Sequence, residues 1–230
     1  MLKYLVIILS NRSTSYCYYD VPDSIAEKTI STDKLKEAIL FGMKENLIIV
    51  LTDINVASQS LISDYRSWLI EFANNGFKEL CMESNRIPQL NIISDRLNLK
   101  AMNNCNAGVD TLTVGPDGKF YICPGFYYDG SESVGDPADG LNIRNGELLK
   151  LDHAPICKVC DAWQCKRCVW SNLHRTHEIN TPGRGQCLIS HCEREASRQL
   201  LSSLKDNGIV LPDTQIETID YNEPFETLTR

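Results

Sequence analysis

Cys157-Lys-Val-Cys160-Asp-Ala-Trp-Gln-Cys165-Lys-Arg-Cys168 places four thiols within twelve residues. Each C-x-x-C unit puts two sulfur atoms at the ends of one tight turn, close enough for both thiolates to hold one metal centre. Four more cysteines flank this stretch: Cys105, Cys123, Cys187 and Cys192. Eight of the ten cysteines therefore lie between residues 105 and 192, which predicts a metal-binding module in the second half of the chain.

The chain as a whole has the composition of a globular protein. It has 230 residues, 43% of them apolar and 23% charged, which is enough for one or two domains with a substantial core. No apolar run approaches the roughly 18 residues that span a bilayer, and the apolar segment 1–9 continues without a small-residue cleavage site. The net charge of −7 disfavours nucleic-acid binding, which needs a surplus of Lys and Arg. We expect a cytoplasmic protein that binds neither membranes nor nucleic acid.

Paired cysteines also occur in disulfide scaffolds, but these are typically short and carry a secretory signal. Neither property applies to this sequence, and C-x-x-C pairs in a reducing compartment indicate metal binding. Basic residues accompany the thiols, with Lys166 and Arg167 inside the stretch and Arg175 and Arg184 after it. We expect them to offset the negative charge of a thiolate-ligated centre.

The first hundred residues alternate short apolar runs with amphipathic segments. Strands are expected at 3–9, 16–19, 47–51, 78–82 and 90–93, and helices at 32–43 and 60–74. Ser31 and Thr32 are candidate caps for the first helix, and Asn75-Gly76 is a candidate end for the second. This order predicts an α/β layer on a mainly parallel sheet, in which Cys17 and Cys81 are structural thiols.

Two β-forming runs lie between Cys105 and Cys123, at 111–114 and 119–122, and Gly115-Pro-Asp-Gly118 separates them. Pro at the second position and Gly at the fourth favour a tight four-residue turn. The pattern predicts a hairpin that brings Cys105, before its first strand, and Cys123, after its second, towards the same end. Two cysteines far apart in sequence would then be neighbours in space.

The order of the cysteines is C-x12-G-x4-C, then C-x2-C-x4-C-x2-C, then a later cysteine. It resembles the SPASM domain at the C-terminal end of radical-SAM peptide-modifying enzymes, although the last two gaps of the middle motif are each one residue narrower here. The segments that contain Cys105, Cys123 and Cys157 are similar, more narrowly, to the CXXX repeat peptide maturase family. The resemblance covers roughly residues 100–200.

The resemblance implies two auxiliary [4Fe-4S] clusters. The ligands that it implies are Cys105, Cys123 and Cys168 for the first cluster, and Cys157, Cys160, Cys165 and Cys187 for the second. The fourth ligand of the first cluster stays open between Cys192, His153, Asp110 and no group of this chain. An open iron position would let a cysteine thiolate of a substrate peptide bind directly.

A radical-SAM enzyme needs C-x-x-x-C-x-x-C, and this sequence contains no such run. We therefore expect that the chain does not cleave S-adenosylmethionine alone and that it is an auxiliary subunit, forming a heterodimer with a separate radical-SAM enzyme. The expected substrate is a cysteine-containing precursor peptide, a ribosomally synthesised peptide whose post-translational modification includes thioether-type crosslinks. No catalytic residue is assigned.

The expected organisation has three parts. Residues 1–100 form a truncated α/β domain of partial-barrel-like βα units, and residues 101–211 form a cysteine-rich, SPASM-like α+β module with the β-hairpin. The module ends in a helix at 193–205 with Asn207-Gly208 as its stop. Residues 212–230 are an acidic tail.

A hypothesis from a different class remains beside this one. The four cysteines of residues 157–168 suffice for a tetrahedral Zn²⁺ site in a structural interaction module. The four-residue gap between the two pairs is short for a zinc ribbon, whose loop has roughly 15–20 residues. The zinc hypothesis also leaves Cys105, Cys123 and Cys187 without a role. An independent electron-transfer iron–sulfur protein differs from the first hypothesis only in its partner.

Overall fold

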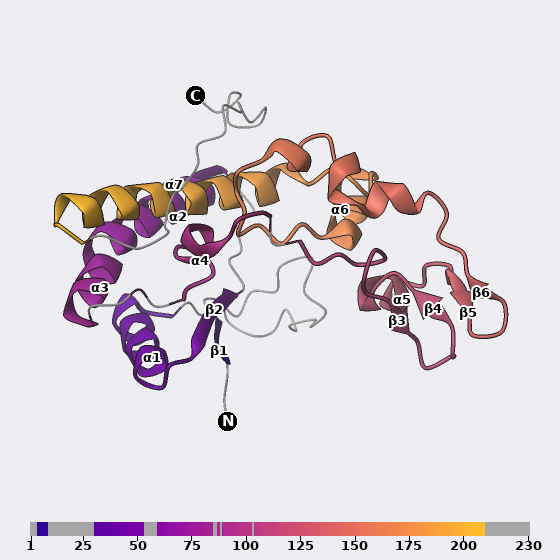
Figure 1. Cartoon of the computed structure of the whole chain (residues 1–230), viewed down its shortest axis with the longest axis horizontal. Coiled ribbons are helices and arrows are strands. Elements are labelled where there is room, and N and C mark those ends of the chain that lie inside the picture. Colours follow the sequence, from indigo (N-terminus) through magenta and orange to yellow (C-terminus); the bar gives the residue numbers. More distant parts are fainter. Residues whose placement is uncertain are drawn as a thin grey trace. The chain divides into compact units, whose positions relative to one another are not determined.

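A computed structural model of the chain describes residues 4–8, 30–52, 59–84, 87, 89–102 and 104–209 (Figure 1). The predictions for 16–19, Cys17 and the tail at 212–230 lie outside these residues. Those described form two compact units, and the chain crosses between them more than once. Unit 1 contains the described residues up to Ala101, Asp161–Gln164, and those from Leu188 to Ile209; unit 2 contains those of Met102–Cys160 and Cys165–Cys187.

Unit 1 contains a parallel pair of strands, β1 (Tyr4–Ile8) and β2 (Ile48–Thr52), joined through helix α1 (Thr32–Lys44). Parallel strands need such a crossover connection, and helices commonly supply it. Ser31 caps α1, with its Oγ accepting from the Lys34 N–H at 3.4 Å. Gly42 brings α1 close to the sheet, because a Cβ there would lie 2.9 Å from Ile49 Cγ1. The two predicted strands, the helix and its cap are confirmed.

One continuous helical segment follows where a helix and then a strand were expected. Helix α2 (Gln59–Glu71) passes into a π-helical turn, η1 (Phe72–Phe77), and then into α3 (Lys78–Ser84). The predicted stop at Asn75-Gly76 and the predicted strand at 78–82 are therefore wrong. The physical reason is burial: the extra residue of the π turn keeps Phe77, Leu80 and Cys81 in the core that Phe72 also joins. That burial outweighs the cost of about 1 kcal/mol for a glycine inside a helix.

The strand expected at 90–93 is reduced to a single bridge between Leu90 and Ile49 of β2. The chain then turns, because the Oγ of Ser94 accepts from the Leu90 N–H at 2.6 Å. The side chain of Asn91 takes over the pairing with β2, accepting from the Leu51 N–H at 2.9 Å and donating to the Leu51 carbonyl at 3.1 Å. A short helix, α4 (Asp95–Asn98), follows.

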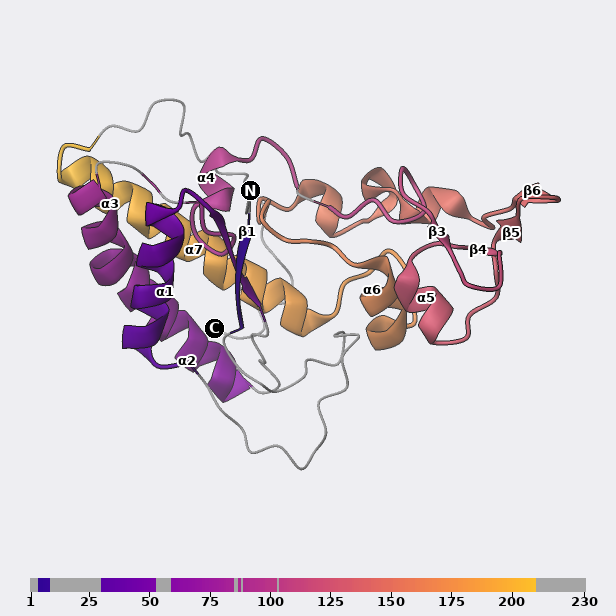
Figure 2. The ribbon, with the colours of Figure 1, turned by 90° about the horizontal axis from the view of Figure 1, so that it is seen from below.

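Helix α7 (Arg184–Asp206) contributes its larger part to unit 1. The apolar face predicted for residues 193–205 is buried, at Ala196, Leu200, Leu201 and Leu204. The helix lies along α2 and η1 (Figures 1 and 2), where Tyr65 Oη donates to Glu193 Oε1 at 3.2 Å and Asn74 Nδ2 to Gln199 Oε1 at 3.3 Å. Among the described residues, no helix is both long enough and apolar enough to cross a bilayer.

Unit 2 consists of short elements. Strands β3 (Thr113–Val114) and β4 (Phe120–Tyr121) form the predicted antiparallel hairpin, closed by a turn in which the Gly118 N–H donates to the Gly115 carbonyl at 2.9 Å. The remaining elements are α5 (Pro124–Tyr128), β5 (Gly135–Asp136), β6 (Gly140–Leu141), η2 (Gly146–Leu149), η3 (Leu151–His153), η4 (Cys157–Val159) and α6 (Val169–Thr176). The structure is thus a mixture of helices and small sheets.

The apolar core of unit 2 is small. Its buried members are Ala107, Phe126, Leu149 and Val169, with partly buried side chains packed around them. Small modules with so little core usually need disulfides or a metal to be stable. None of the nine described cysteines forms a disulfide.

Candidate metal centre

The seven cysteines that the sequence predicts as cluster ligands all lie in unit 2. They are Cys105, Cys123, Cys157, Cys160, Cys165, Cys168 and Cys187. The other two described cysteines, Cys81 and Cys192, lie in the apolar core of unit 1. Burial raises the pKa of the Cys81 thiol to about 12, as expected of a structural thiol in an apolar environment.

Cys123 and Cys168 occupy equivalent positions at the start of two short helices. Cys123 is the residue before α5, and Cys168 is the residue before α6, where its Sγ accepts from the Ser171 N–H at 3.4 Å. Two residues further along each helix, Gly125 faces Trp170 so closely that a Cβ on Gly125 would lie 2.8 Å from the indole ring. This contact joins the first turns of the two helices.

A carboxylate at the end of α5 completes this contact. Asp129 Oδ2 accepts from Trp170 Nε1 at 2.7 Å and lies 3.0 Å from His174 Nε2. His174 also points its Nδ1 at the Trp170 carbonyl, at 2.9 Å. Both ring nitrogens therefore face oxygen acceptors. Helices α5 and α6 are held together by packing and by the polar contacts of Asp129.

The Cys105 thiol reaches the same region from the loop before the hairpin. Its Sγ donates to the carbonyl of Arg167, the residue before Cys168, at 3.5 Å. Burial raises the pKa of Cys168, and the nearby thiolates of Cys105 and Cys123 raise it further. Cys105 and Cys123, the other two thiols predicted for the first cluster, thus both lie within electrostatic reach of Cys168.

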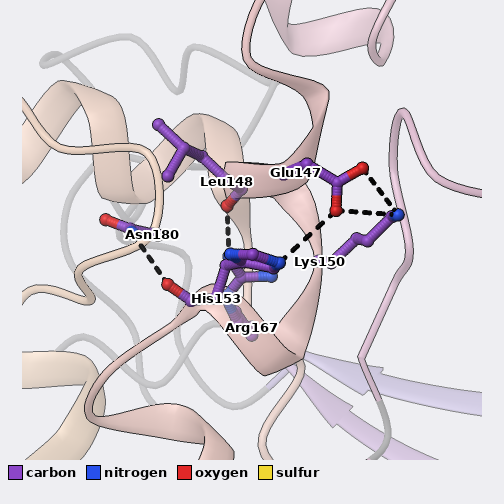
Figure 3. Close-up of polar contacts among 6 residues, drawn as sticks. All are labelled: Glu147, Leu148, Lys150, His153, Arg167 and Asn180. Atoms are coloured by element: carbon purple, nitrogen blue, oxygen red, sulfur yellow. Dashed lines mark hydrogen bonds and ion pairs between the residues drawn. The ribbon is translucent and has the colours of Figure 1, made fainter.

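Arg167 is a buried cation among these thiols, with only 1% of its surface exposed. Its Nη1 donates to the Leu149 carbonyl at 2.7 Å. Its Nη2 donates to the Leu148 carbonyl at 3.3 Å, the contact drawn in Figure 3. Its Nε is buried and has no hydrogen-bond partner among the described residues. Burial lowers the pKa of Arg167, and four thiolates oppose this shift: Cys157, Cys105, Cys165 and Cys168. No carboxylate of the described residues is among the groups that act on it.

The remaining thiols are those predicted for the second cluster; three of them precede Arg167 in the sequence, and Cys187 follows it. Cys157 begins the turn η4, and burial raises the pKa of its thiol to about 11, an effect that Arg167 opposes and the Cys160 thiolate reinforces. Gln186 Nε2 lies 3.7 Å from Cys165 Sγ, and Cys187 follows it in the first turn of α7. Of the thiols predicted for the second cluster, Cys157 and Cys165 therefore lie within electrostatic reach of Arg167, and Cys160 within that of Cys157.

The three candidates for an extra ligand have other surroundings. His153 is half exposed; its Nε2 lies 3.4 Å from Glu147 Oε2, and its carbonyl accepts from Asn180 Nδ2 at 2.9 Å (Figure 3). Glu147 also pairs with Lys150 at 2.9 Å (Figure 3). Asp110 accepts from Asn106 Nδ2 at 2.9 Å. Cys192 is part of the unit 1 core.

The thiols predicted as ligands lie in one unit, but they do not form a complete metal site. In the described part of the chain, no three His, Cys, Asp or Glu side chains are placed to hold one metal ion. Binding a metal centre would require the sulfur atoms to move closer together. The chemistry of the donor set nevertheless fits a thiolate-ligated centre, because four cysteines act on a buried guanidinium on which no carboxylate of the described residues acts.

Two features of the site were beyond the sequence. The Gly125–Trp170 contact and the hydrogen bond from Trp170 to Asp129 join residues about 40 positions apart, and no local pattern signals them. Arg167 was expected to act on the thiols, but nothing in the sequence distinguished it from its neighbour Lys166, which is exposed.

Comparison with protein-family models and with curated proteins finds no match. The assignment of function therefore depends on the residues themselves.

Gly125→Ala is expected to destabilise unit 2 by about 1–3 kcal/mol, the usual cost of overpacking. The added Cβ would collide with the Trp170 ring and push α5 away from α6. Urea unfolding followed by tryptophan fluorescence measures the loss. Gly146→Ala is the matched control, because its Cβ would meet its nearest neighbour at an ordinary 3.5 Å. Equal stability of the two variants would contradict the prediction.

Proposed function

We propose that this protein is an auxiliary iron–sulfur subunit of a radical-SAM peptide maturation system. In this proposal unit 2 is a SPASM-like module that binds two [4Fe-4S] clusters, and unit 1 is a truncated, partial-barrel-like α/β domain. The substrate is a precursor peptide with repeated cysteines, and the partner is a separate radical-SAM enzyme. The observation that carries the proposal is Arg167, a buried guanidinium on which four cysteines act.

The charge on Arg167 supports an anionic centre at this place. A buried charge costs several kcal/mol unless a partner compensates it, and two carbonyl groups neutralise only part of a guanidinium. Four of the proposed ligands act on it electrostatically: Cys105, Cys157, Cys165 and Cys168. A thiolate-ligated iron–sulfur cluster supplies the missing negative charge and sulfur acceptors for N–H groups, which help to set its reduction potential.

The proposed ligands divide as the resemblance implies. Cys105, Cys123 and Cys168 would hold the first cluster, and Cys157, Cys160, Cys165 and Cys187 the second. When bound, such clusters supply one-electron redox chemistry and, at an iron with an open position, a site for a peptide thiolate. The chain's own residues would hold the clusters, exclude water and balance their charge.

The same thiols also allow a zinc site, and metal analysis separates the two proposals. The protein is purified without oxygen, and its iron, acid-labile sulfide and zinc contents are measured together with its visible spectrum. About eight irons and eight sulfides per chain, the content of two four-iron clusters, is the expected result. One zinc and no sulfide, even after reconstitution with iron and sulfide, would overturn the proposal and leave a structural zinc module.

A further inference from the structure

Four residues between the two C-x-x-C pairs belong to a different unit from the cysteines on both sides of them. Asp161–Gln164 is part of unit 1, whereas Cys160 and Cys165 are part of unit 2. The chain thus leaves unit 2 after the first pair, passes through unit 1 and returns for the second pair. A four-residue linker between two turns does not need to enter another unit, so specific contacts must hold it there.

Asp161 is held by two arginines of α7. The residue is only 1% exposed. Its Oδ1 accepts from Arg194 Nη1 at 2.7 Å, and its Oδ2 accepts from Arg198 Nη2. Burying a carboxylate with arginines yields little net stability, because desolvation offsets the attraction, but breaking such a pair is costly. This arrangement therefore fixes the position of Asp161.

The other three residues of the segment are held as well. Ala162 is fully buried, and Trp163 stacks with Arg96, whose Cζ lies 3.9 Å from the indole ring centroid. Gln164 is 5% exposed, and its Nε2 donates to the Ser190 carbonyl at 2.7 Å and to Glu193 Oε2 at 3.1 Å. Every residue of the segment is thus fixed to unit 1.

The consequence for the thiols follows from the covalent chain. Cys160 is bonded to Asp161, and Cys165 to Gln164, so the backbones of both cysteines are tied to an anchored segment. The anchor sets the separation between the end of the first C-x-x-C pair and the start of the second. A metal centre that draws on both pairs needs that separation, because ligand geometry tolerates little error.

We infer that Asp161–Gln164 is a positioning segment for the metal ligands: seated in unit 1, it holds Cys160 and Cys165 ready for binding. By thermodynamic linkage, metal binding in turn stabilises the ion pairs of Asp161 with Arg194 and Arg198. The inference rests on the proposed function in one respect, that these thiols bind a metal centre. It holds for an iron–sulfur cluster and for zinc.

The test uses Asp161→Asn, which keeps the shape of the side chain and removes its charge. Glu79→Gln is the matched control, because it makes the same chemical change in an exposed ion pair of unit 1, with Lys36. Full-length protein is reconstituted with iron and sulfide, and iron release to a chelator is followed at a temperature at which circular dichroism shows each variant folded. We expect release at least tenfold faster from Asp161→Asn and unchanged from Glu79→Gln.

A second readout separates positioning from simple loss of stability. Amide hydrogen exchange is measured over residues 190–198 of α7 before and after metal loading. Loading is expected to slow exchange in the wild type and in Glu79→Gln but not in Asp161→Asn. If metal loading leaves the exchange rates of these amides unchanged in the wild type, the proposed coupling between metal binding and the Asp161 ion pairs is overturned. If Asp161→Asn does not fold, Arg198→Gln is used instead. It removes the ion pair of Asp161 with the more exposed of the two arginines and is expected to accelerate metal release several-fold.

The outcomes distinguish this inference from the function it rests on. If the wild type loads metal and Asp161→Asn releases it at the wild-type rate, only the inference is overturned. If the wild type loads zinc instead, release is followed with a zinc-sensitive dye, and the iron–sulfur function alone is overturned. If the wild type binds neither metal, both are overturned.

Discussion

Arg167→Gln is expected to lower the reduction potential of the iron–sulfur centre by about 60–100 mV. Reduction adds negative charge to a cluster, and the guanidinium stabilises that charge, so its removal favours the oxidised form. A unit charge close to the centre, at an effective dielectric constant of about 20, contributes on the order of 2 kcal/mol. For a one-electron couple about 1.4 kcal/mol corresponds to 59 mV. Potentiometric titration of the reconstituted protein, followed by visible or magnetic resonance spectra, measures the shift.

Lys166→Gln is the control for this prediction. It removes a positive charge from the adjacent residue, but Lys166 is exposed, so water and salt screen its charge. The shift in reduction potential expected for Lys166→Gln is a small fraction of the shift expected for Arg167→Gln. Arg167→Lys, which keeps the charge but loses the planar group that spans the Leu148 and Leu149 carbonyls, separates charge from hydrogen bonding. Equal shifts in the Lys166 and Arg167 variants would contradict a specific role for the buried cation.

Cys157→Ser is expected to lose about half of the bound iron, because it removes a ligand of one of two clusters. The comparison with Cys81→Ser makes the test specific. Both thiols are buried, and burial raises the pKa of Cys157 to about 11 and of Cys81 to about 12. Cys81, however, lies in the apolar core of unit 1, so its serine variant should lose stability and keep its iron. Iron loss in both variants would show that folding, not ligation, limits cluster binding.

The raised pKa of Cys157 also predicts how metal binding depends on pH. Below pH 11 the thiol is protonated, and a metal must displace that proton to bind. Affinity should therefore rise with pH, by up to about tenfold per unit for each proton released. Cys157→Ser releases one proton fewer, so its affinity should rise less steeply than that of the wild type. Competition with a chelator between pH 6.5 and 8.5 compares the slopes; parallel slopes would contradict the role of Cys157.

The parts of the fold that local chemistry specifies could be predicted from the sequence. Ser31 is placed to cap a helix whose apolar residues recur at helical spacing, and the structure has α1 there. The Gly115-Pro-Asp-Gly118 turn joins β3 and β4 as predicted. In each case the sequence pattern and the structure that it forms involve the same few neighbouring residues, so the pattern predicts the structure without knowledge of distant contacts.

The parts that depend on burial could not be predicted. Asn75-Gly76 has the local chemistry of a helix end, but the core that contains Phe72 and Phe77 keeps the chain helical through η1 into α3. Residues 90–93 have the composition of a strand, yet the side chains of Asn91 and Ser94 replace most of the backbone pairing. Hydrophobicity indicates that a segment is buried, and the partners that bury it decide its backbone conformation.

For the site, the sequence by itself determined which atoms are available: paired thiols at C-x-x-C spacing and basic residues beside them. Only the tertiary structure decided that Arg167 is buried among the thiols while Lys166 is exposed, and that Asp161 is clamped by arginines more than thirty residues away. The physical reason is that ligand spacing is a local property of the covalent chain. Burial and charge pairing depend on residues that only the folded chain brings together.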